Sequence, residues 1–432
     1  MYKPFIFKLS NGNNEFLNED NSIILSDLIT QPLISLGFHA FIHRTKSGMS
    51  ITKNLELKNN FYHVVNPFEH IIEDYDKDIK NETIKYLGSK DEPDILSRAF
   101  YKMWEIIKVF DLFDKTSINY AAIAEAPGSF VQAVIKFREK EKYDIKNDKV
   151  FSVTIHAEKG NYINMNKNFL GYYNTNYPAL IKNHKTYTKL VSNKYKSRDN
   201  GDITKVKTIE LFKRDIGQNK IGLVTADGGF EWENENYQEQ EAYQLILGEI
   251  IAALRVISKG GNFVLKIFET FTMVTIKMVY LLSSFFEETY VYKPYFSRKS
   301  NSEKYLVCKN FKFETKDIEK KIKNMEKVLE SMETNSYVAD IFTNLEIPDE
   351  FLNLMKYINV QIANEQQILI NKMITYIKNN NYFGEKFHQY KDEQIKASEW
   401  WINNFFSEKD DLSKLIEKQL AYNDSEIKVL FK

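Results

Sequence analysis

Cysteine, proline and glycine are scarce in this chain of 432 residues, with one, eight and sixteen copies, and long apolar runs are missing. The single cysteine, Cys308, excludes an intrachain disulfide and fits a reducing compartment. No stretch approaches the roughly 18 apolar residues of a membrane span. Residues 1–14 have neither the apolar core nor the small-residue cleavage site of a secretory signal. We therefore expect a protein without disulfides, targeting segment or membrane span.

Neither sign of charge is in excess, because 59 lysines and arginines balance 59 aspartates and glutamates. This balance argues against a generic polycation that coats nucleic acid, although it leaves room for a local basic patch. Hydrophobic residues make up 43% and charged residues 27%, which is typical of a folded globular protein. The 31 Phe and 26 Tyr, with many Lys, Asn and Ile, indicate an AT-rich genome. This bias, the single cysteine and the lack of a basic cluster like a nuclear-localisation signal together suit a large DNA virus or a protist protein that works in the cytoplasm, in a viral factory or in a virion.

The chain divides into three regions by pattern. Residues 1–90 mix short apolar runs with Asn and Asp turns and carry no motif, which indicates an α+β region of unknown role. Residues 91–315 alternate strand-like and helix-like segments. Residues 316–432 are strongly charged and show helical periods, for example from Ile318 to Met332, so we expect this region to be mostly helical.

The middle region predicts an α/β fold, with a parallel or mixed sheet covered by helices on both faces. Short apolar segments typical of buried strands are residues 118–124, 150–155, 221–226, 262–268 and 302–308. Helices are expected over residues 97–110, 131–139 and 238–258. The last of these should stop at Gly260, acting as a glycine C-cap. Ligands of such sheets bind at the carboxyl ends of the strands.

Three predicted strand ends carry residues suited to chemistry. The turn Glu125–Phe130 (EAPGSF) contains one glycine, so a ligand can approach its backbone closely. Asp227 follows the third strand, and Lys266 lies inside the fourth. Each feature also has a purely structural explanation: a connecting loop, an aspartate that caps a turn, or a lysine that extends from an edge strand to solvent. A lysine within a central strand, however, is unfavourable unless it is paired or functional.

Read together, several ordered motifs resemble those of the FtsJ-like (RrmJ-like) 2′-O-ribose RNA methyltransferases and, within them, the mRNA cap-1 enzymes of eukaryotes and viruses. The similarity spans about residues 95–311. The segments that carry it are Ser97–Met103 (SRAFYKM), Glu125–Phe130 (EAPGSF), Asn200–Thr204 (NGDIT), Ala226–Phe230 (ADGGF), Gly260–Phe268 (GGNFVLKIF) and Lys293–Lys309 (KPYFSRKSNSEKYLVCK). The last segment matches the family pattern K-P-x-x-S-R-x-x-N-S-E-[KR]-Y and is the most specific.

This resemblance implies a Rossmann-like methyltransferase sheet with S-adenosyl-L-methionine as cofactor. The family's Lys-Asp-Lys-Glu tetrad falls on Lys102, Asp227, Lys266 and Glu303. The implied cofactor contacts are Ser97, Glu125, Ala126, Pro127, Gly128, Ser129, Phe130, Asp202 and Ile203. Ser129 replaces the family's usual second glycine, which is tolerable if its φ is negative. Ala122 stands where many relatives have an acidic residue, so Glu125 or Asp202 is expected to supply that contact.

The chemistry explains why lysines should lie beside carboxylates. A ribose 2′-hydroxyl is a poor nucleophile until its proton is removed, whereas a sulfonium is a good leaving group, so no metal is required. Lys266 can act as the base only if its pKa falls from about 10.4 toward neutrality. Burial and the nearby Lys102 would lower this pKa, while Asp227 and Glu303 would raise it. We expect the two carboxylates to orient the lysines.

A basic segment after the second strand, Lys159–Arg198, has seven lysines, one arginine and no acidic residue. It also carries aromatic side chains, at Tyr162, Phe169, Tyr172, Tyr173, Tyr177, Tyr187 and Tyr195. Such a stretch suits phosphate contacts and base stacking, although a solvated lysine-rich insertion has the same composition. With the segments that the resemblance adds, the residues expected to bind RNA are Lys182, Lys185, Lys189, Asn236, Tyr237, Gln238 and Asn301.

The leading interpretation is an enzyme that methylates a ribose 2′-hydroxyl of RNA, at the first transcribed nucleotide of capped mRNA. One alternative is the same reaction on ribosomal or transfer RNA. Another is a catalytically inactive RNA-binding or structural subunit on the same fold. The seven histidines show no metal-ligand spacing, so no metal site is expected. Residues 1–90 and 316–432 are candidates to recognise the cap, bind a partner protein or cover the core.

Overall fold

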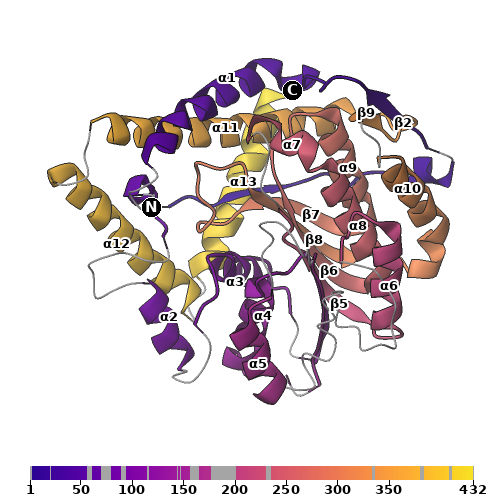
Figure 1. Ribbon diagram of the computed structural model, residues 1–432, viewed down its shortest axis with the longest axis horizontal. Coiled ribbons are helices and arrows are strands. Elements are labelled where there is room, and N and C mark those ends of the chain that lie inside the picture. Colours follow the sequence, from indigo (N-terminus) through magenta and orange to yellow (C-terminus); the bar gives the residue numbers. More distant parts are fainter. Residues whose placement is uncertain are drawn as a thin grey trace.

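The computed structural model shows an α/β protein with one large sheet through its centre (Figure 1). It describes residues 2–19, 21–55, 61–69, 79–88, 94–113, 116–143, 145, 147–155, 165–176, 201–229, 235–332, 336–379, 384–407 and 411–431. Among the helices in these ranges, none has the length together with the apolarity that crossing a bilayer demands.

The central sheet has seven strands in the order β1-β7-β8-β6-β5-β3-β4. Their bounds are β1 Phe5–Lys8, β3 Asn119–Ile123, β4 Lys149–Val153, β5 Ile221–Ala226, β6 Ile257–Ile267, β7 Phe286–Lys293 and β8 Lys304–Phe311. β4, β3, β5 and β6 are parallel, whereas β8 is antiparallel to β6 and β7, and β1 is antiparallel to β7. The parallel strands are buried on both faces, which is why they are continuous apolar runs in the sequence. This arrangement confirms the predicted fold class.

Helices cover both faces of the sheet. Alternate residues of β3 belong to two apolar cores, with Ala121 and Ile123 in one and Tyr120 and Ala122 in the other. The first core contains side chains of α6 (Val206–Ile216), α8 (Tyr243–Val256), α9 (Met273–Phe285) and α10 (Glu319–Ser331). The second contains side chains of α3 (Ala99–Phe110), α4 (Ser129–Lys140) and α5 (Lys167–Asn176). The loops that follow β3, β5 and β6 therefore meet at one edge of the sheet, between these two layers.

Segments outside the predicted middle region join the same sheet and cores. β1 is an edge strand of the sheet, and β2 (Ile23–Ser26) pairs with β9 (Tyr337–Ile341) in a second, two-stranded sheet. Helices α12 (Glu385–Phe405) and α13 (Asp411–Leu430) supply Trp401 and Ile416 to the second core. In Figure 1, α11 (Asp349–Lys378) crosses the top of the molecule beside α1 (Leu36–Ser47), while α2 (Ile79–Leu87) lies near α12. The described parts of residues 1–90, 91–315 and 316–432 thus pack around one sheet.

Element boundaries differ from the prediction around β6. The helix expected over residues 238–258 is two helices, α7 (Gln238–Glu241) and α8. Gly260 does not cap a helix: it lies inside β6 with a φ of +80°. The prediction was wrong because β6 begins early, at Ile257, which pairs with Ile221 of β5. The sequence also gave no sign of β7, since FEETYVYK lacks the short apolar run by which the other strands were predicted.

Candidate active site

Four charged side chains meet at the carboxyl edge of the parallel strands. Lys102 lies in the first turn of α3, Asp227 follows β5, Lys266 lies near the end of β6, and Glu303 directly precedes β8. They form two ion pairs, with Lys102 Nζ 2.6 Å from Glu303 Oε1 and Lys266 Nζ 3.1 Å from Asp227 Oδ1. All four side chains are between 12% and 18% exposed. The structure thus brings the predicted tetrad together, while the catalytic role of each residue stays a prediction.

Asp227 Oδ1 is shared by two donors. Tyr305 OH donates to it at 3.0 Å, in addition to the ion pair with Lys266. Lys266 Nζ also donates to the Asp227 carbonyl oxygen at 2.9 Å. Tyr305 is fully buried in β8 and lies opposite Lys266 in the antiparallel register. Tyr305 is therefore a site residue that the sequence analysis missed; its place two residues after Glu303, within the most specific motif, was the available signal.

The pKa of Lys266 differs from the expectation. Burial acts to lower it, but Asp227, Glu303 and the buried Glu249 raise it, and the resulting pKa lies above the usual lysine value. The expected fall toward neutrality is therefore wrong for the arrangement described, because the carboxylates outweigh burial and Glu303 neutralises Lys102. Lys266 rests as an ammonium ion, and it must lose a proton before it can act as a base.

Two lysines control Glu303. Burial acts to raise the pKa of Glu303, but Lys102 and Lys266 hold it well below its usual range, so this carboxylate stays ionised. Lys293 fixes its backbone, since Lys293 Nζ donates to the carbonyl oxygens of Glu303 at 2.5 Å and Asn301 at 3.0 Å. Burial lowers the pKa of Lys293 to about 7. The lysine that opens the family's closing motif therefore positions the loop that carries Glu303.

A cavity of about 270 Å³ lies next to Asp227, between the loops that follow β3, β4 and β5. Its lining residues are Ala124, Ile155, Gly201, Asp202, Ile203, Thr204, Gly228, Gly229 and Leu245. Of the predicted cofactor contacts, Asp202 and Ile203 line it. Gly201 has a φ of +77°, and a Cβ there would lie 2.1 Å from the carbonyl oxygen of Thr154, so only glycine fits this wall. Apolar walls with one carboxylate suit a nucleoside, whose base packs on the walls while its hydroxyl groups donate to the carboxylate.

The side chain of Glu125 points away from this cavity. Glu125 is 4% exposed, and its Oε1 accepts a hydrogen bond from the backbone N–H of Val131 at 2.9 Å, in the first turn of α4. Burial raises the pKa of Glu125 to about 8. Asp202, and not Glu125, is therefore the carboxylate placed to supply the contact that Ala122 lacks.

The remaining residues of the turn offer backbone to a ligand. Ser129 is not among the residues with positive φ, which satisfies the condition for replacing a glycine, and its Oγ lies 2.8 Å from Ser97 Oγ. Phe130 is buried and packs against Tyr305, with ring centroids 6.0 Å apart. Gly128 has a φ of +115°. Ser129 and Phe130 offer no exposed side chain to a ligand. Ala126, Pro127 and Gly128 have no polar side-chain group, so a polar contact from them would use the main chain.

Glu249 of α8 is a second residue that the sequence analysis missed. It is 1% exposed, and its Oε1 accepts a hydrogen bond from the backbone N–H of Gly228 at 3.0 Å. A Cβ on Gly228 would lie 2.2 Å from that oxygen, so the contact requires glycine. Burial raises the pKa of Glu249 to about 8, although Lys266 acts to lower it. Glu249 thus fixes the turn between Asp227 and the cavity; its only signal was a glutamate in the middle of a mostly apolar helix.

Some residues expected to bind RNA lie beside Glu303. Gln238 Oε1 accepts a hydrogen bond from Ser302 Oγ at 2.7 Å, which places the start of α7 against the loop that carries Asn301 and Glu303. Asn301 is exposed. Asn236 Nδ2 donates to Ser47 Oγ of α1 at 3.2 Å, and Tyr237 lies between Asn236 and Gln238 in the chain. RNA contact by these residues stays a prediction.

Most of the basic segment, including Lys182, Lys185 and Lys189, lies outside the described residues. Residues 165–176 of it are described, and they correct one interpretation. Phe169 and Tyr173 of α5 are fully buried in the second core, and Phe169 packs where a Cβ on Gly128 would fall. These two rings cannot stack on bases, because an amphipathic helix has turned them inward. Cys308 is buried in β8, as expected for a small core residue.

The site is a small cluster of two lysines and two carboxylates. Within the described ranges, no group of three or more His, Cys, Asp or Glu side chains could hold a metal ion. A mostly parallel sheet, a cavity of about 270 Å³ at its carboxyl edge and two largely buried lysine–carboxylate pairs are the arrangement of a nucleotide-binding α/β protein. Residues 95–311, half of the chain, match the family FtsJ-like methyltransferase, and the protein belongs to that family.

Several curated relatives are named as cap-specific mRNA (nucleoside-2′-O-)-methyltransferases. Enzyme 2 of Drosophila melanogaster is 27% identical over 284 residues, which cover 64% of this chain and 38% of that protein. Enzyme 1 of Mus musculus is 41% identical over 123 residues, which cover 27% and 15%. A Caenorhabditis briggsae relative named as inactive, 1B, is 25% identical over 221 residues, which cover 49% and 26%. The chain therefore matches less than two fifths of the length of these relatives.

Proposed function

We propose that the protein transfers the methyl group of S-adenosyl-L-methionine to a ribose 2′-hydroxyl of RNA, at the first transcribed nucleotide of capped mRNA. The observation that carries this proposal is the pair of ion pairs, Lys102–Glu303 and Lys266–Asp227, beside a cavity of about 270 Å³. Family membership supports methyl transfer, and the names of the relatives support the capped substrate.

The residues around the cavity fit this cofactor. Asp202 offers a carboxylate to the ribose hydroxyls, while Ile203 and Leu245 offer apolar surface to the adenine. The cavity continues to Gly228 and Gly229, next to Asp227, so a nucleoside bound there would point its sulfur end toward the tetrad. Bound S-adenosyl-L-methionine supplies an electrophilic methyl group on a cationic sulfonium.

In the proposed reaction, the 2′-oxygen forms a bond to the methyl carbon, the carbon–sulfur bond breaks, and the hydroxyl proton passes to Lys266. Tyr305 holds the Asp227 carboxylate, and Asp227 in turn holds Lys266, so the base is kept in one geometry for the 2′-hydroxyl. Because Lys266 rests protonated, its ammonium group first releases a proton to solvent, which a further positive charge nearby would favour, and the neutral amine then accepts the hydroxyl proton. Lys102 and Glu303 flank the pair and keep the site close to electrical balance.

Two alternatives remain open to test. A relative named as inactive shows that similarity over this region does not by itself establish activity, so a non-catalytic RNA-binding subunit is the first. The complete tetrad favours an enzyme, because an inactive site has no need to keep two largely buried lysines. The second alternative is methylation of ribosomal or transfer RNA, which needs the same site.

We also propose that the basic segment binds RNA through Lys182, Lys185 and Lys189, and that the protein acts in the cytoplasm. The composition of the basic segment supports RNA binding, since a lysine-rich segment without acidic residues attracts phosphates. RNA binding should weaken steeply as salt rises, and changing these three lysines to glutamate should weaken it further. Unchanged binding by that triple variant would remove the segment from the proposal. A viral source and a partner protein stay predictions.

The test is methyl transfer from labelled S-adenosyl-L-methionine to two RNAs of one sequence, only one of which carries a 7-methylguanosine cap. Transfer to the capped RNA alone supports the proposal. Equal transfer to both would move the substrate to RNA in general. Calorimetry with the cofactor separates the remaining case, because an inactive structural subunit need not bind it.

A further inference from the structure

Helix α11 reaches the active site from outside the family's matched segment. It runs from Asp349 to Lys378, whereas the family similarity ends at residue 311. Two of its amide side chains, Asn359 and Gln366, are 3% and 2% exposed. They are seven residues apart, or two helical turns, so they lie on one face of the helix about 10 Å from each other. Buried amides require partners, and the identity of those partners is informative.

Each amide binds a loop next to a tetrad residue: the loop that follows Lys266 at the end of β6, or the loop that carries Glu303. Asn359 Nδ2 donates to the carbonyl oxygen of Thr270 at 2.6 Å, and Thr270 Oγ1 donates back to Asn359 Oδ1. Thr270 is buried and lies four residues after Lys266. Gln366 Nε2 donates to the carbonyl oxygen of Ser300 at 3.0 Å, three residues before Glu303.

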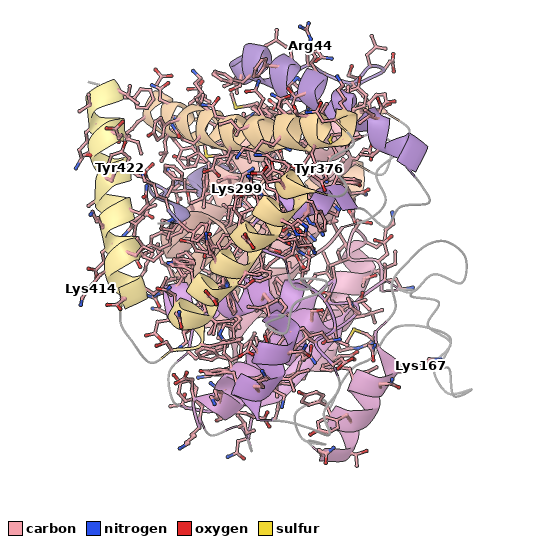
Figure 2. The ribbon with its side chains drawn as sticks, turned by 90° about the vertical axis from the view of Figure 1, so that its left-hand side faces the viewer. Arg44, Lys167, Lys299, Tyr376, Lys414 and Tyr422 are labelled. Carbon is pink, nitrogen blue, oxygen red and sulfur yellow. The ribbon has the colours of Figure 1, made fainter. Side chains whose placement is uncertain are left out.

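A neighbouring ion pair joins the same helix to the same loop. Lys299 Nζ lies 3.0 Å from Glu365 Oε1, and the two side chains are 42% and 37% exposed. In Figure 2, Lys299 is labelled just below α11, the horizontal orange helix. A pair this exposed contributes little by itself, so the buried amide bonds are the principal link.

We propose that Asn359 and Gln366 are positioning residues, which hold the end of β6 that carries Lys266 and the loop that carries Glu303 at a fixed separation for catalysis. Glu303 raises the pKa of Lys266, and that influence depends on the distance between the two loops. α11 bonds to both loops through two buried amide side chains. The short helix α7 also contacts both loops, because Glu239 accepts hydrogen bonds from Thr272 and Gln238 accepts one from Ser302. This inference rests on the proposed function, because it assigns the helix a role in that same reaction.

The test compares Gln366→Met and Asn359→Leu with two control variants of α11. Gln366→Met keeps the side-chain length but loses the donor to Ser300. It should lower kcat about tenfold, with the KM for RNA and the Kd for S-adenosyl-L-methionine changed less than about threefold. The pH dependence of kcat should also move toward lower pH, because a displaced Glu303 raises the pKa of Lys266 less. Asn359→Leu should give the same pattern.

The controls separate positioning from general stability. Leu369→Ala removes a buried side chain that belongs to the separate apolar cluster of Val64 and Met373, one turn after Gln366, so it should lower Tm while kcat stays within about twofold. Ile368→Ala, at a 58% exposed site, should change neither. If Gln366→Met and Asn359→Leu keep the wild-type kcat and pH profile, or if Leu369→Ala reproduces their loss, the inference is wrong. A wild-type protein that transfers no methyl group would instead count against the proposed function.

Discussion

Tyr305 and Lys266 bind the same carboxylate oxygen, Oδ1 of Asp227, at 3.0 and 3.1 Å. The two donors come from adjacent antiparallel strands and face each other in the register. Asp227 therefore cannot rotate without losing both contacts, and Lys266 keeps its place at the edge of the cavity. This shared oxygen is the centre of the proposed site.

Tyr305→Phe tests that arrangement. The change removes one hydroxyl and its hydrogen bond to a charged group, an interaction of about 1.5–3 kcal/mol. We expect kcat to fall about tenfold or more, with cofactor affinity unchanged, because Asp227 gains freedom while the cavity stays intact. Steady-state kinetics with calorimetry measure both quantities. An unaltered kcat would show that Lys266 and the backbone fix Asp227 without the tyrosine.

The protonation of Lys266 should be visible in the pH dependence of methyl transfer. Its pKa is raised in the structure, so the group is protonated at neutral pH and the rate should increase as pH rises through that pKa. Glu303→Gln removes one of the charges that raise the pKa, so the ascending limb should shift to lower pH while the maximal rate falls. Lys266→Arg, which cannot deprotonate in this range, should be inactive at every pH. A flat profile for the wild type would argue against Lys266 as the base.

Stability should also depend on pH through buried carboxyl groups. The pKa of Glu249 is raised by burial to about 8, so the folded protein binds a proton there that the unfolded chain releases above pH 4–5. Stability from this group is therefore present at low pH and is lost as pH rises toward 8. Glu249→Gln keeps the acceptor for Gly228 and removes the titration.

The Glu249→Gln variant should thus lose less stability than the wild type between pH 5 and pH 8, by an amount on the order of 1 kcal/mol or more. Urea unfolding at several pH values measures the difference. The control is Glu139→Gln in α4. The Glu139 side chain is 21% exposed, compared with 1% for Glu249, and this variant should follow the wild type. Parallel curves for all three proteins would mean that Glu249 is ionised in the fold.

The cavity predicts which substitutions weaken cofactor binding. Asp202→Ala removes the carboxylate from the wall, and we expect the Kd for S-adenosyl-L-methionine to rise about tenfold. Glu125→Gln, at a carboxyl group that faces α4 instead of the cavity, should leave the Kd within about twofold. Isothermal titration gives both values. Equal effects of the two substitutions would place the nucleoside elsewhere.

The sequence predicted those parts of the fold and site that depend on local pattern. Strands such as Ile221–Ala226 are apolar runs because they are buried on both faces, so the amino-acid sequence alone is enough to predict them. The tetrad residues were found because each stands at a fixed place in an ordered motif. Their meeting as two ion pairs, and not merely as four neighbours, depends on three-dimensional distances.

Other features depend on contacts between distant segments. The pKa of Lys266 reflects a balance between burial and three carboxylates, one of which, Glu249, comes from a helix with no motif. Phe169 and Tyr173 were expected to suit RNA, but their helix buries both rings in the second core, with Phe169 beside Gly128. The hydrogen bonds from α11 to the loop after Lys266 and to the loop of Glu303 join a helix outside residues 95–311 to segments inside that range. No local sequence pattern predicts such bonds.

The most direct test of the central claim is to locate the transferred methyl group on a capped RNA. Methylation of a 2′-oxygen blocks alkaline cleavage of the following phosphodiester, because that hydroxyl is the nucleophile of the cleavage. We predict label in an alkali-resistant fragment that contains the cap and the first two nucleotides, and no label in the Lys266→Ala protein, which should still bind the cofactor. Label in a base or at an internal ribose, or undiminished transfer by Lys266→Ala, would contradict the account.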